Sequence, residues 1–355
     1  MRKNARLLAA SLAALGLFAT ACGGDDSGSS SSAAPSGSAA TSDLVAGVAF
    51  DTGGRGDGTF NDSAAVGADR ATSELGVTVK ELEANVDEDR KANLELLVGD
   101  GAKVIVGVGF MFTDPMTEIA TANPDINFGI VDGWIDAGCG AEATLKNVSC
   151  LGFAENEGSF LVGAAAALKS KSGHIGFIGG QEIDLIKKFE AGYTAGAKYI
   201  NPDIVVDVKY LGPAGDNSAW GNVDGAKEIA AGWYADGADV IYTAAGGSGA
   251  GTIQAAIEAD AWAIGVDSDQ YLTSGDPEAQ KHILTSMIKR VDVSVFETIK
   301  AVAGGDKTGG AKTFNLANDG VGYATSGGYV DDIKDQLEAI KADIIAGKIT
   351  VPTAP

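Results

Sequence analysis

The chain has 355 residues, of which 45% are hydrophobic and 21% are charged. This apolar content excludes a disordered or fibrous chain, and the length favours two lobes of roughly 150 residues each. A formal net charge of −22, without a cluster of Lys and Arg, argues against nucleic-acid binding. Two histidines and three cysteines are little material for a zinc site or a histidine-based catalytic array, so we expect no metal and no cofactor.

Residues 1–21 are typical of an export signal. Three basic residues among the first six precede an apolar run from Leu7 to Ala21, and small residues lead to Cys22. This run is shorter than the ~20 apolar residues that a membrane-spanning helix needs. The segment resembles a bacterial lipoprotein signal, in which the cysteine becomes the lipid-bearing N-terminus, although Ala19 stands where that pattern most often has Leu. Ordinary secretion without lipid on Cys22 is the alternative.

Residues 22–42 are almost wholly Gly, Ser, Ala, Asp and Thr. Such a composition cannot bury enough apolar surface to fold, so we expect a tether with a typical span of roughly 25 Å. Export also leaves Cys139 and Cys150 as a pair in a compartment that permits disulfides. We therefore expect a disulfide that closes a short loop; two free buried thiols are the alternative.

From residue 44 onward, short strand patterns alternate with helical patterns. Runs such as Val104–Val106 are continuously apolar, which is typical of strands covered on both faces by helices. The pattern predicts an α/β fold with doubly wound, mainly parallel sheets. A second series of the same kind begins near His174.

Two short segments recur at nearly the same spacing. Gly101–Ile105 returns as Gly237–Ile241, and the strand that ends at Asp132 returns as the strand that ends at Asp267. Two similar lobes are therefore predicted. Each Asp follows a buried strand at the sheet edge where open α/β sheets bind ligands, so the two should face each other across a cleft. The alternative is that each Asp only caps a turn.

A loop that carries an aromatic residue follows a predicted strand in each lobe. The first, residues 51–63, has many glycines but lacks the P-loop and dinucleotide patterns, and it presents Phe60 before a helix. The second, residues 212–222, presents Trp220. Two rings from opposite lobes could enclose a planar group such as a nucleobase or a sugar. The alternative for Phe60 is that it folds back onto its own helix.

Two further features belong to the predicted cleft. The glycine-rich turn of residues 244–251 would let backbone amides approach a ligand, although a plain connecting loop would look the same. Lys289, shortly after an expected strand at 282–285, could pair with Asp267 or donate to a hydroxyl. An ordinary surface lysine is the alternative.

Several stretches resemble the basic membrane protein family of bacterial lipoproteins, the substrate-binding components of ABC-type nucleoside uptake systems. The most specific are the FxENEGSFLVGAAAA segment at 153–167 and GVDxDQ at 265–270. The others are Gly58–Asn61, Phe189–Tyr193, Gly237–Ile241 and Leu284–Asp292. Together they span nearly the whole body of the chain.

The resemblance implies a type I periplasmic-binding-protein fold, with two Rossmann-like lobes joined by three crossovers. We place the N-terminal lobe at 43–153 plus about 275–318, and the C-terminal lobe at 154–274 plus about 319–355. The implied partners are a nucleoside, an ABC permease and, through the lipid, the cell membrane, for an extracytoplasmic protein that is a monomer and not an enzyme.

The family's site implies roles for individual residues. Phe60 and Trp220 would stack on the base, Asp132 would read the base edge, and Asp267 and Lys289 would hold the ribose. The expected ligand-binding residues are Asp51, Phe60, Asn61, Phe110, Asp132, Trp220, Gly246, Gly247, Asp267 and Lys289. Trp220 departs from the family pattern, which commonly has Phe, and so does the insertion that carries Cys139 and Cys150.

Three other functions fit parts of the sequence. A sugar receptor on the same fold would also use an Asp and a Lys for a vicinal diol. A nucleoside hydrolase would need calcium-binding acids, and Asp51, Asp57 and Asp62 share one loop. A signalling receptor or adhesin would use the same cleft.

Overall fold

The computed structural model describes residues 43–306 and 309–355. The predicted signal segment, Cys22 and the tether lie outside these residues. Within them, no helix combines the length and the apolar character needed to cross a membrane.

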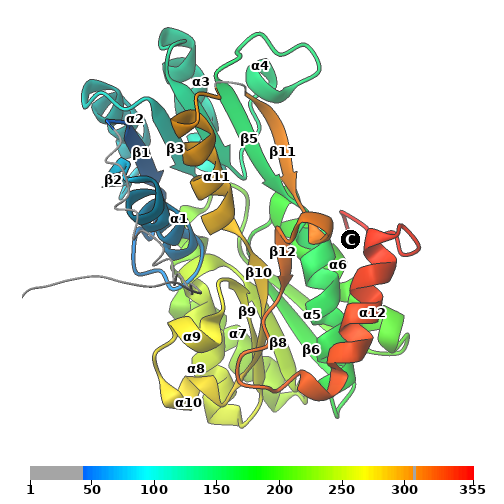
Figure 1. Ribbon diagram of the computed structural model, residues 1–355. Coiled ribbons are helices and arrows are strands. Elements are labelled where there is room, and N and C mark those ends of the chain that lie inside the picture. Colours follow the sequence, from blue (N-terminus) through cyan, green and yellow to red (C-terminus); the bar gives the residue numbers. More distant parts are fainter. Residues whose placement is uncertain (1–42, 307–308) are drawn as a thin grey trace, which may run out of the picture. The chain divides into compact units, whose positions relative to one another are not determined.

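Two six-stranded sheets form the framework (Figure 1). The first sheet is wholly parallel, with the order β11-β5-β4-β3-β1-β2, and the second has the order β12-β10-β9-β8-β6-β7, in which only β12 is antiparallel. The strands of the first sheet are β1 (Val45–Phe50), β2 (Thr78–Glu83), β3 (Val104–Val108), β4 (Asn127–Val131), β5 (Val148–Phe153) and β11 (Gly310–Phe314). Those of the second are β6 (His174–Gln181), β7 (Val205–Gly212), β8 (Val240–Ala244), β9 (Trp262–Asp267), β10 (Ile283–Lys289) and β12 (Val321–Tyr323).

Helices cover both faces of each sheet, as the continuously apolar strands require. In the first lobe, α1 packs with α11 and α2 packs with α3; in the second, α5 packs with α6 and α7 with α8. These helices are α1 (Phe60–Leu75), α2 (Asp87–Gly99), α3 (Thr113–Ala122), α5 (Glu155–Lys169), α6 (Asp184–Ile200), α7 (Val223–Ala235), α8 (Gly249–Ala259) and α11 (Val291–Ala303). The remaining helices are α4 (Asp136–Cys139), α9 (Gln270–Thr273), α10 (Pro277–Gln280) and α12 (Lys334–Ile345), which packs on α5.

Glycines allow α5 and α6 to lie very close together. A Cβ atom at Gly163 would be 2.1 Å from the carbonyl oxygen of Tyr193, and one at Gly196 would be 2.0 Å from that of Phe160. Any larger residue would therefore push the two helices apart. This contact gives a packing reason for glycine at position 163, the last residue of the ENEGSFLVG motif.

The chain crosses between the two sheets three times, as the type I periplasmic-binding-protein fold predicts. The crossovers run from β5 to α5, from β10 to α11, and from β11 to β12. They are hydrogen-bonded to one another, because the amide of Ala154 donates to Phe314 and that of Arg290 donates to Gly320. The connecting segments therefore form one joined hinge.

One expected lobe boundary is wrong. We placed residues from about 275 to 318 in the N-terminal lobe, but β10 pairs with β9 and β12 in the second sheet. The crossover falls at Arg290, so the N-terminal lobe resumes with α11. Lys289 is accordingly the last residue of β10 rather than a residue beyond a strand that ends at 285. The apolar run of β10 gave no sign of which sheet it joins.

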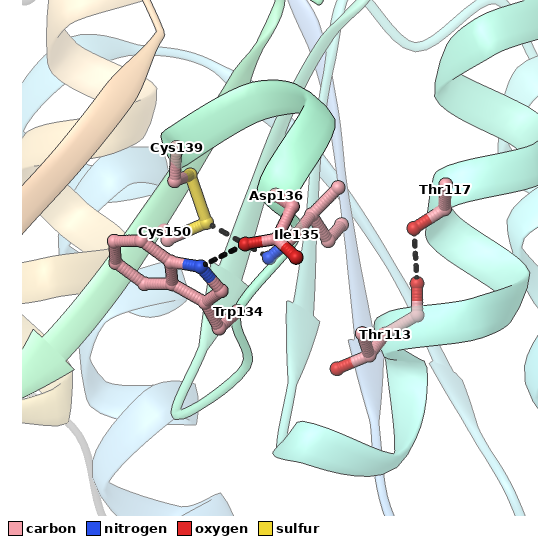
Figure 2. Close-up of a disulfide and its surroundings, with 7 residues drawn as sticks. All are labelled: Thr113, Thr117, Trp134, Ile135, Asp136, Cys139 and Cys150. Atoms are coloured by element: carbon pink, nitrogen blue, oxygen red, sulfur yellow. Dashed lines mark hydrogen bonds between the residues drawn. A yellow bond between two sulfur atoms is a disulfide. The ribbon is translucent and has the colours of Figure 1, made fainter. Parts of the chain in front are cut away.

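A disulfide joins Cys139 at the end of α4 to Cys150 in β5 (Figure 2). The backbone amide of Ile135 donates to the Cys150 sulfur at 3.4 Å, and the indole of Trp134 donates to Asp136 at 2.8 Å. The disulfide thus fixes α4, which begins four residues after Asp132, to β5, the strand beside the edge strand β11.

Candidate functional site

A cavity of about 230 Å³ lies between the two lobes, at the carboxyl ends of the parallel strands. All ten residues expected to bind a ligand line it: Asp51, Phe60, Asn61, Phe110, Asp132, Trp220, Gly246, Gly247, Asp267 and Lys289. The structure therefore brings the whole predicted set to one place, where open α/β sheets bind their ligands.

Asp132 and Asp267 occupy equivalent positions in the two lobes. Asp132 follows β4 and Asp267 ends β9, and both have left-handed backbone conformations, with φ of 62° and 64°. Non-glycine residues adopt this conformation rarely, and such residues cluster at functional sites. The internal repeat therefore extends to the backbone conformation of these two residues.

Lys289 is the cation of the cavity, and its partners differ from those expected. Its Nζ atom donates to Asp132 Oδ2 at 2.6 Å and lies 3.3 Å from Glu155 Oε1. The expected ion pair with Asp267 is not the one that forms, because β10 ends with the ammonium directed to the first crossover and to the end of β4. A surface lysine is also excluded, since Lys289 is 2% exposed.

Aromatic rings surround the same ammonium. Lys289 Nζ lies 5.3 Å from the ring centroid of Phe60, 5.0 Å from that of Phe153 and 5.5 Å from that of Phe189. Such distances allow cation–π attraction. Phe60 lines the cavity and also packs against the main core.

Glu155 is a buried acid whose role the sequence did not reveal. It is the first residue of α5 and is fully buried, with Lys188 donating to its second oxygen at 3.1 Å. The helix N-terminus also favours a negative charge here. The only local signal was its place in the ENEG motif. Glu155 links the first crossover, through Lys289, to the second.

Burial and neighbouring charges shift the protonation of Asp267 and Lys289. Burial raises the pKa of Asp267 to about 7, with Lys289 opposing and Asp132 adding to the effect. Burial disfavours the charged form of Lys289 as well, but the carboxylates of Asp132, Glu155 and Asp267 raise the pKa of Lys289 above its usual value. The cluster therefore holds a permanent cation beside a carboxyl group that titrates near neutral pH.

Asp51 lies in the N-terminal lobe and has a different cation. Arg90 donates to Asp51 Oδ1 from Nη2 at 2.6 Å and from Nε at 2.9 Å, and the amide of Thr52 donates to the same oxygen at 2.8 Å. The other oxygen, Oδ2, is buried without a hydrogen-bond partner. Burial raises the pKa of Asp51, although Arg90 opposes this effect. The sequence pattern did not point to Arg90.

The ring that contacts Trp220 is Phe110, not Phe60. Their centroids are 6.3 Å apart in an edge-to-face arrangement that joins the two lobes. Trp220 lies over Gly180, where a Cβ atom would be 2.4 Å from the indole. Glycine at position 180 therefore makes room for the indole of Trp220. The resemblance led us to expect the smaller ring of Phe at position 220.

The loop of residues 51–63 is fixed by its own acids. Asp57 accepts hydrogen bonds from the amides of Thr59, Asn61 and Asp62, and Asp62 accepts from two glycine amides. The side chain of Asn61 bonds to Asp57 and to the amide of Asp51. These carboxylates therefore shape the loop instead of converging on one point, as a calcium-dependent hydrolase would need.

The glycine-rich turn after β8 approaches Trp220 closely. Gly246 has a φ of 55°, and Cβ atoms at Gly246 and Gly247 would lie 3.4 and 3.5 Å from the Trp220 carbonyl oxygen. The left-handed backbone favours glycine at position 246. The turn therefore brings main-chain atoms to the cavity wall.

Solved structures with similar folds define the class of protein. A solute-binding protein of an ABC transporter system from Aeropyrum pernix K1 superposes with a TM-score of 0.73 and 28% sequence identity, covering 87% of this chain and 93% of that one. Two α/β lobes around a central site are thus the architecture of a solute-binding protein of an ABC transporter.

Sequence comparison narrows the class to a family. The chain belongs to the family of PnrA-like ABC transporter substrate-binding proteins, whose model matches residues 44–354. The ABC transporter nucleoside-binding protein BmpA of Lactococcus lactis subsp. cremoris is 38% identical, covering 88% of this chain and 90% of the relative. Basic membrane protein D of Borreliella burgdorferi is 32% identical, covering 95% and 92%.

Proposed function

We propose that this protein captures a nucleoside between its two lobes and delivers it to an ABC permease. The observation that carries the proposal is the composition of the cavity wall, where Phe60 and Trp220 from opposite lobes accompany Asp267 and Lys289. Aromatic faces suit a nucleobase, and a carboxylate with an ammonium suits ribose hydroxyls. The Lactococcus relative, named as a nucleoside-binding protein, supports the same ligand class.

The ribose contact differs in detail from a simple Asp–Lys clamp. An ammonium has three donors, and Lys289 uses one of them for a hydrogen bond to Asp132. Glu155 Oε1 lies at ion-pair distance, 3.3 Å, without a hydrogen bond, so a donor remains for a ligand hydroxyl. Asp267 is the acid of the cluster that lines the cavity without a direct bond to Lys289. We assign Asp267 as the main hydroxyl acceptor, with Lys289 donating once.

The base contacts are assigned to the two lobes. Phe60 and Trp220 would stack on a base, preferably a purine, because the indole offers a large face. Asp132 would read the base edge as the family pattern implies, and Asp51 Oδ2 is a second acceptor. The loop acids support binding over hydrolysis, because backbone amides engage them.

Calorimetry with four ligands tests this proposal. A purine ribonucleoside should bind at least tenfold more tightly than its 2′,3′-dideoxy analogue, its free base or ribose, because a site built for hydroxyls leaves buried polar groups unpaired when they are missing. Equal affinity for ribose and the nucleoside would indicate a sugar receptor. Equal affinity for the nucleoside, the dideoxy analogue and the free base would contradict the ribose contacts.

We further propose that lipid on Cys22 anchors a monomeric protein outside the cell membrane. The support is the short apolar run that ends in small residues before this cysteine. Cys22→Ser should release the protein into the medium or wash fraction. A variant that stays in the membrane with an uncleaved N-terminus would show a spanning anchor instead.

A further inference from the structure

A continuous chain of side-chain hydrogen bonds leads from the cavity to the opposite lobe. Arg90 Nη2 donates to Asp51 Oδ1 at 2.6 Å, and Arg90 Nη1 donates to Asp87 Oδ1 at 2.7 Å. The same Asp87 oxygen accepts from Asn217 Nδ2 at 3.0 Å. Asn217 belongs to the second lobe, where its Oδ1 atom accepts from Gln181 at 3.0 Å. Asp51 is thus connected to the C-terminal lobe through three side chains.

The two ends of this chain differ in burial. Arg90 and Asp51 are almost fully buried, with side chains 4% and 6% exposed, whereas Asp87 is 73% exposed. A buried guanidinium is stable only when its donors are satisfied, so Arg90 requires both acids. The chain therefore has a fixed inner end and an outer end at the rim of the cleft.

Arg90 also decides which Asp51 oxygen is available. Two Arg90 nitrogens and the Thr52 amide occupy Oδ1, while Oδ2 is buried and without a partner. Asp51 lines the cavity, and Arg90 does not. Oδ2 is therefore the oxygen left to accept from a ligand donor, and Arg90 sets its orientation without touching the ligand.

We propose that Arg90 is a positioning residue that couples the orientation of Asp51 to contact between the lobes, through Asp87 and Asn217. The inference rests on the proposed function, because it takes the cavity as the ligand site. When the lobes meet, Asn217 bonds to Asp87 and the Arg90 fork is held at its outer end. When they part, Asp87 loses that bond, and the hold on Asp51 loosens.

The planar fork of arginine is necessary for this role. It presents separate nitrogens to Asp51 and Asp87 at fixed angles, whereas the single ammonium of lysine is a point donor on a flexible stem. Arg90→Lys should keep the buried charge but not both contacts. This variant therefore separates positioning from charge neutralisation.

A second set of contacts between the lobes provides a matched control. Ser268 donates to the Thr59 carbonyl at 2.7 Å and Thr273 donates to the Gly58 carbonyl at 3.0 Å. These bonds also join the lobes, but they end on backbone carbonyls of the 51–63 loop and do not involve the Asp51 carboxylate or Arg90. Thr273→Val therefore removes one lobe contact outside the proposed coupling, at a residue that does not line the cavity.

The decisive experiment is a pair of double-mutant cycles on the dissociation constant of a purine ribonucleoside. Asp51→Asn and Asn217→Ala are each expected to weaken binding, and their effects should deviate from multiplication by about three- to tenfold because the residues are coupled. Asp51→Asn combined with Thr273→Val should multiply within about twofold. Multiplicative behaviour in both cycles would overturn the proposal, as would equal deviation in both.

Two further measurements test the role of the arginine fork and separate the coupling from ligand binding. Arg90→Lys should abolish the coupling between Asp51 and Asn217 if the fork carries it, and unchanged coupling in that background would contradict the proposal. If the wild-type protein binds no nucleoside, the proposed function fails. The same two cycles on urea unfolding of the ligand-free protein then decide the coupling alone, since Asp87 bridges both sides without ligand.

Discussion

The two buried cations of the cleft are held in different ways. Arg90 joins one buried acid, Asp51, to one exposed acid at the rim. Lys289 lies instead among acids that are all buried, with Asp132 5% and Glu155 0% exposed. The difference shows the effect of the partners: a buried cation bonded to an exposed acid can transmit contact between lobes, whereas one enclosed by buried acids concentrates charge and shifts protonation.

The largest effect is expected from removing the enclosed cation. Lys289→Met keeps the length of the side chain but leaves its carboxylates without their ammonium, which should lower the free energy of unfolding by about 3–5 kcal/mol. Urea denaturation at pH 7 measures this loss. Lys187→Met is the control, because Lys187 pairs at 3.2 Å with the half-exposed Glu182 and should cost less than about 1 kcal/mol. Similar losses would show that Lys289 is not held by its acids.

The enclosed cluster should also make stability depend on pH. Burial raises the pKa of Asp267 from its usual value of 3.8 to about 7 in the folded protein, so its contribution to stability is full below about pH 4 and is lost as the pH rises through 7. Asp267→Asn removes this loss and should be more stable than wild type at pH 8, by up to about 4 kcal/mol. The advantage should shrink toward pH 4.

Urea denaturation at pH 5 and pH 8 measures the dependence on Asp267. The exposed Asp203→Asn is the control and should change stability equally at both values. If the stability difference between Asp267→Asn and wild type is the same at pH 5 and pH 8, Asp267 is charged throughout this range. The buried acids around Lys289 would then not shift protonation, contrary to the comparison with Arg90.

The rings of Phe60 and Trp220 compare the surroundings of Lys289 with the rest of the cavity. Base stacking is worth about 1–3 kcal/mol per ring, so Phe60→Ala and Trp220→Ala should each weaken nucleoside binding about 5- to 150-fold by calorimetry. Phe60→Ala should also lower stability, because its ring lies 5.3 Å from Lys289 Nζ. Tyr199→Ala, which removes an exposed ring, is the control. Unchanged affinity in both cavity variants would make the rings core residues.

The smallest effect belongs to the outer end of the Arg90 chain. Asp87→Asn removes an exposed charge but keeps an oxygen for Arg90 and Asn217, so it should lower the free energy of unfolding by less than about 1 kcal/mol. Urea denaturation beside Lys289→Met gives the comparison directly. A loss as large as that of Lys289→Met would show that exposure does not separate the two cations.

The sequence predicted the sheets and the repeat because each has a local signal, whereas several cavity residues were expected only from the family resemblance. Continuous apolar runs mark strands, and the repeated Asp follows a repeated strand. The partners of the buried cations have no such signal. Arg90 is 39 residues from Asp51, and Lys289 is 157 residues from Asp132, so only the folded chain brings them together.

The lobe of β10 was predicted wrongly for a related reason. Its apolar pattern fits either sheet, and the choice depends on pairing with β9 and β12. Trp220 illustrates the same limit, because the ring it contacts is Phe110 and that contact depends on how the lobes meet. Periodicity predicts an element, but its neighbours are determined by packing over the whole chain.

Each sheet takes its strands from two separate parts of the chain, which limits where the protein can be divided into two fragments. A break between Phe153 and Ala154 leaves the first fragment with five strands of its sheet, while the sixth, β11, stays on the second fragment together with α11. No single break yields a complete lobe. The protein is therefore suited to being split into two halves that report on proximity, since β11 can complete its sheet only by adding to β5 of the other half.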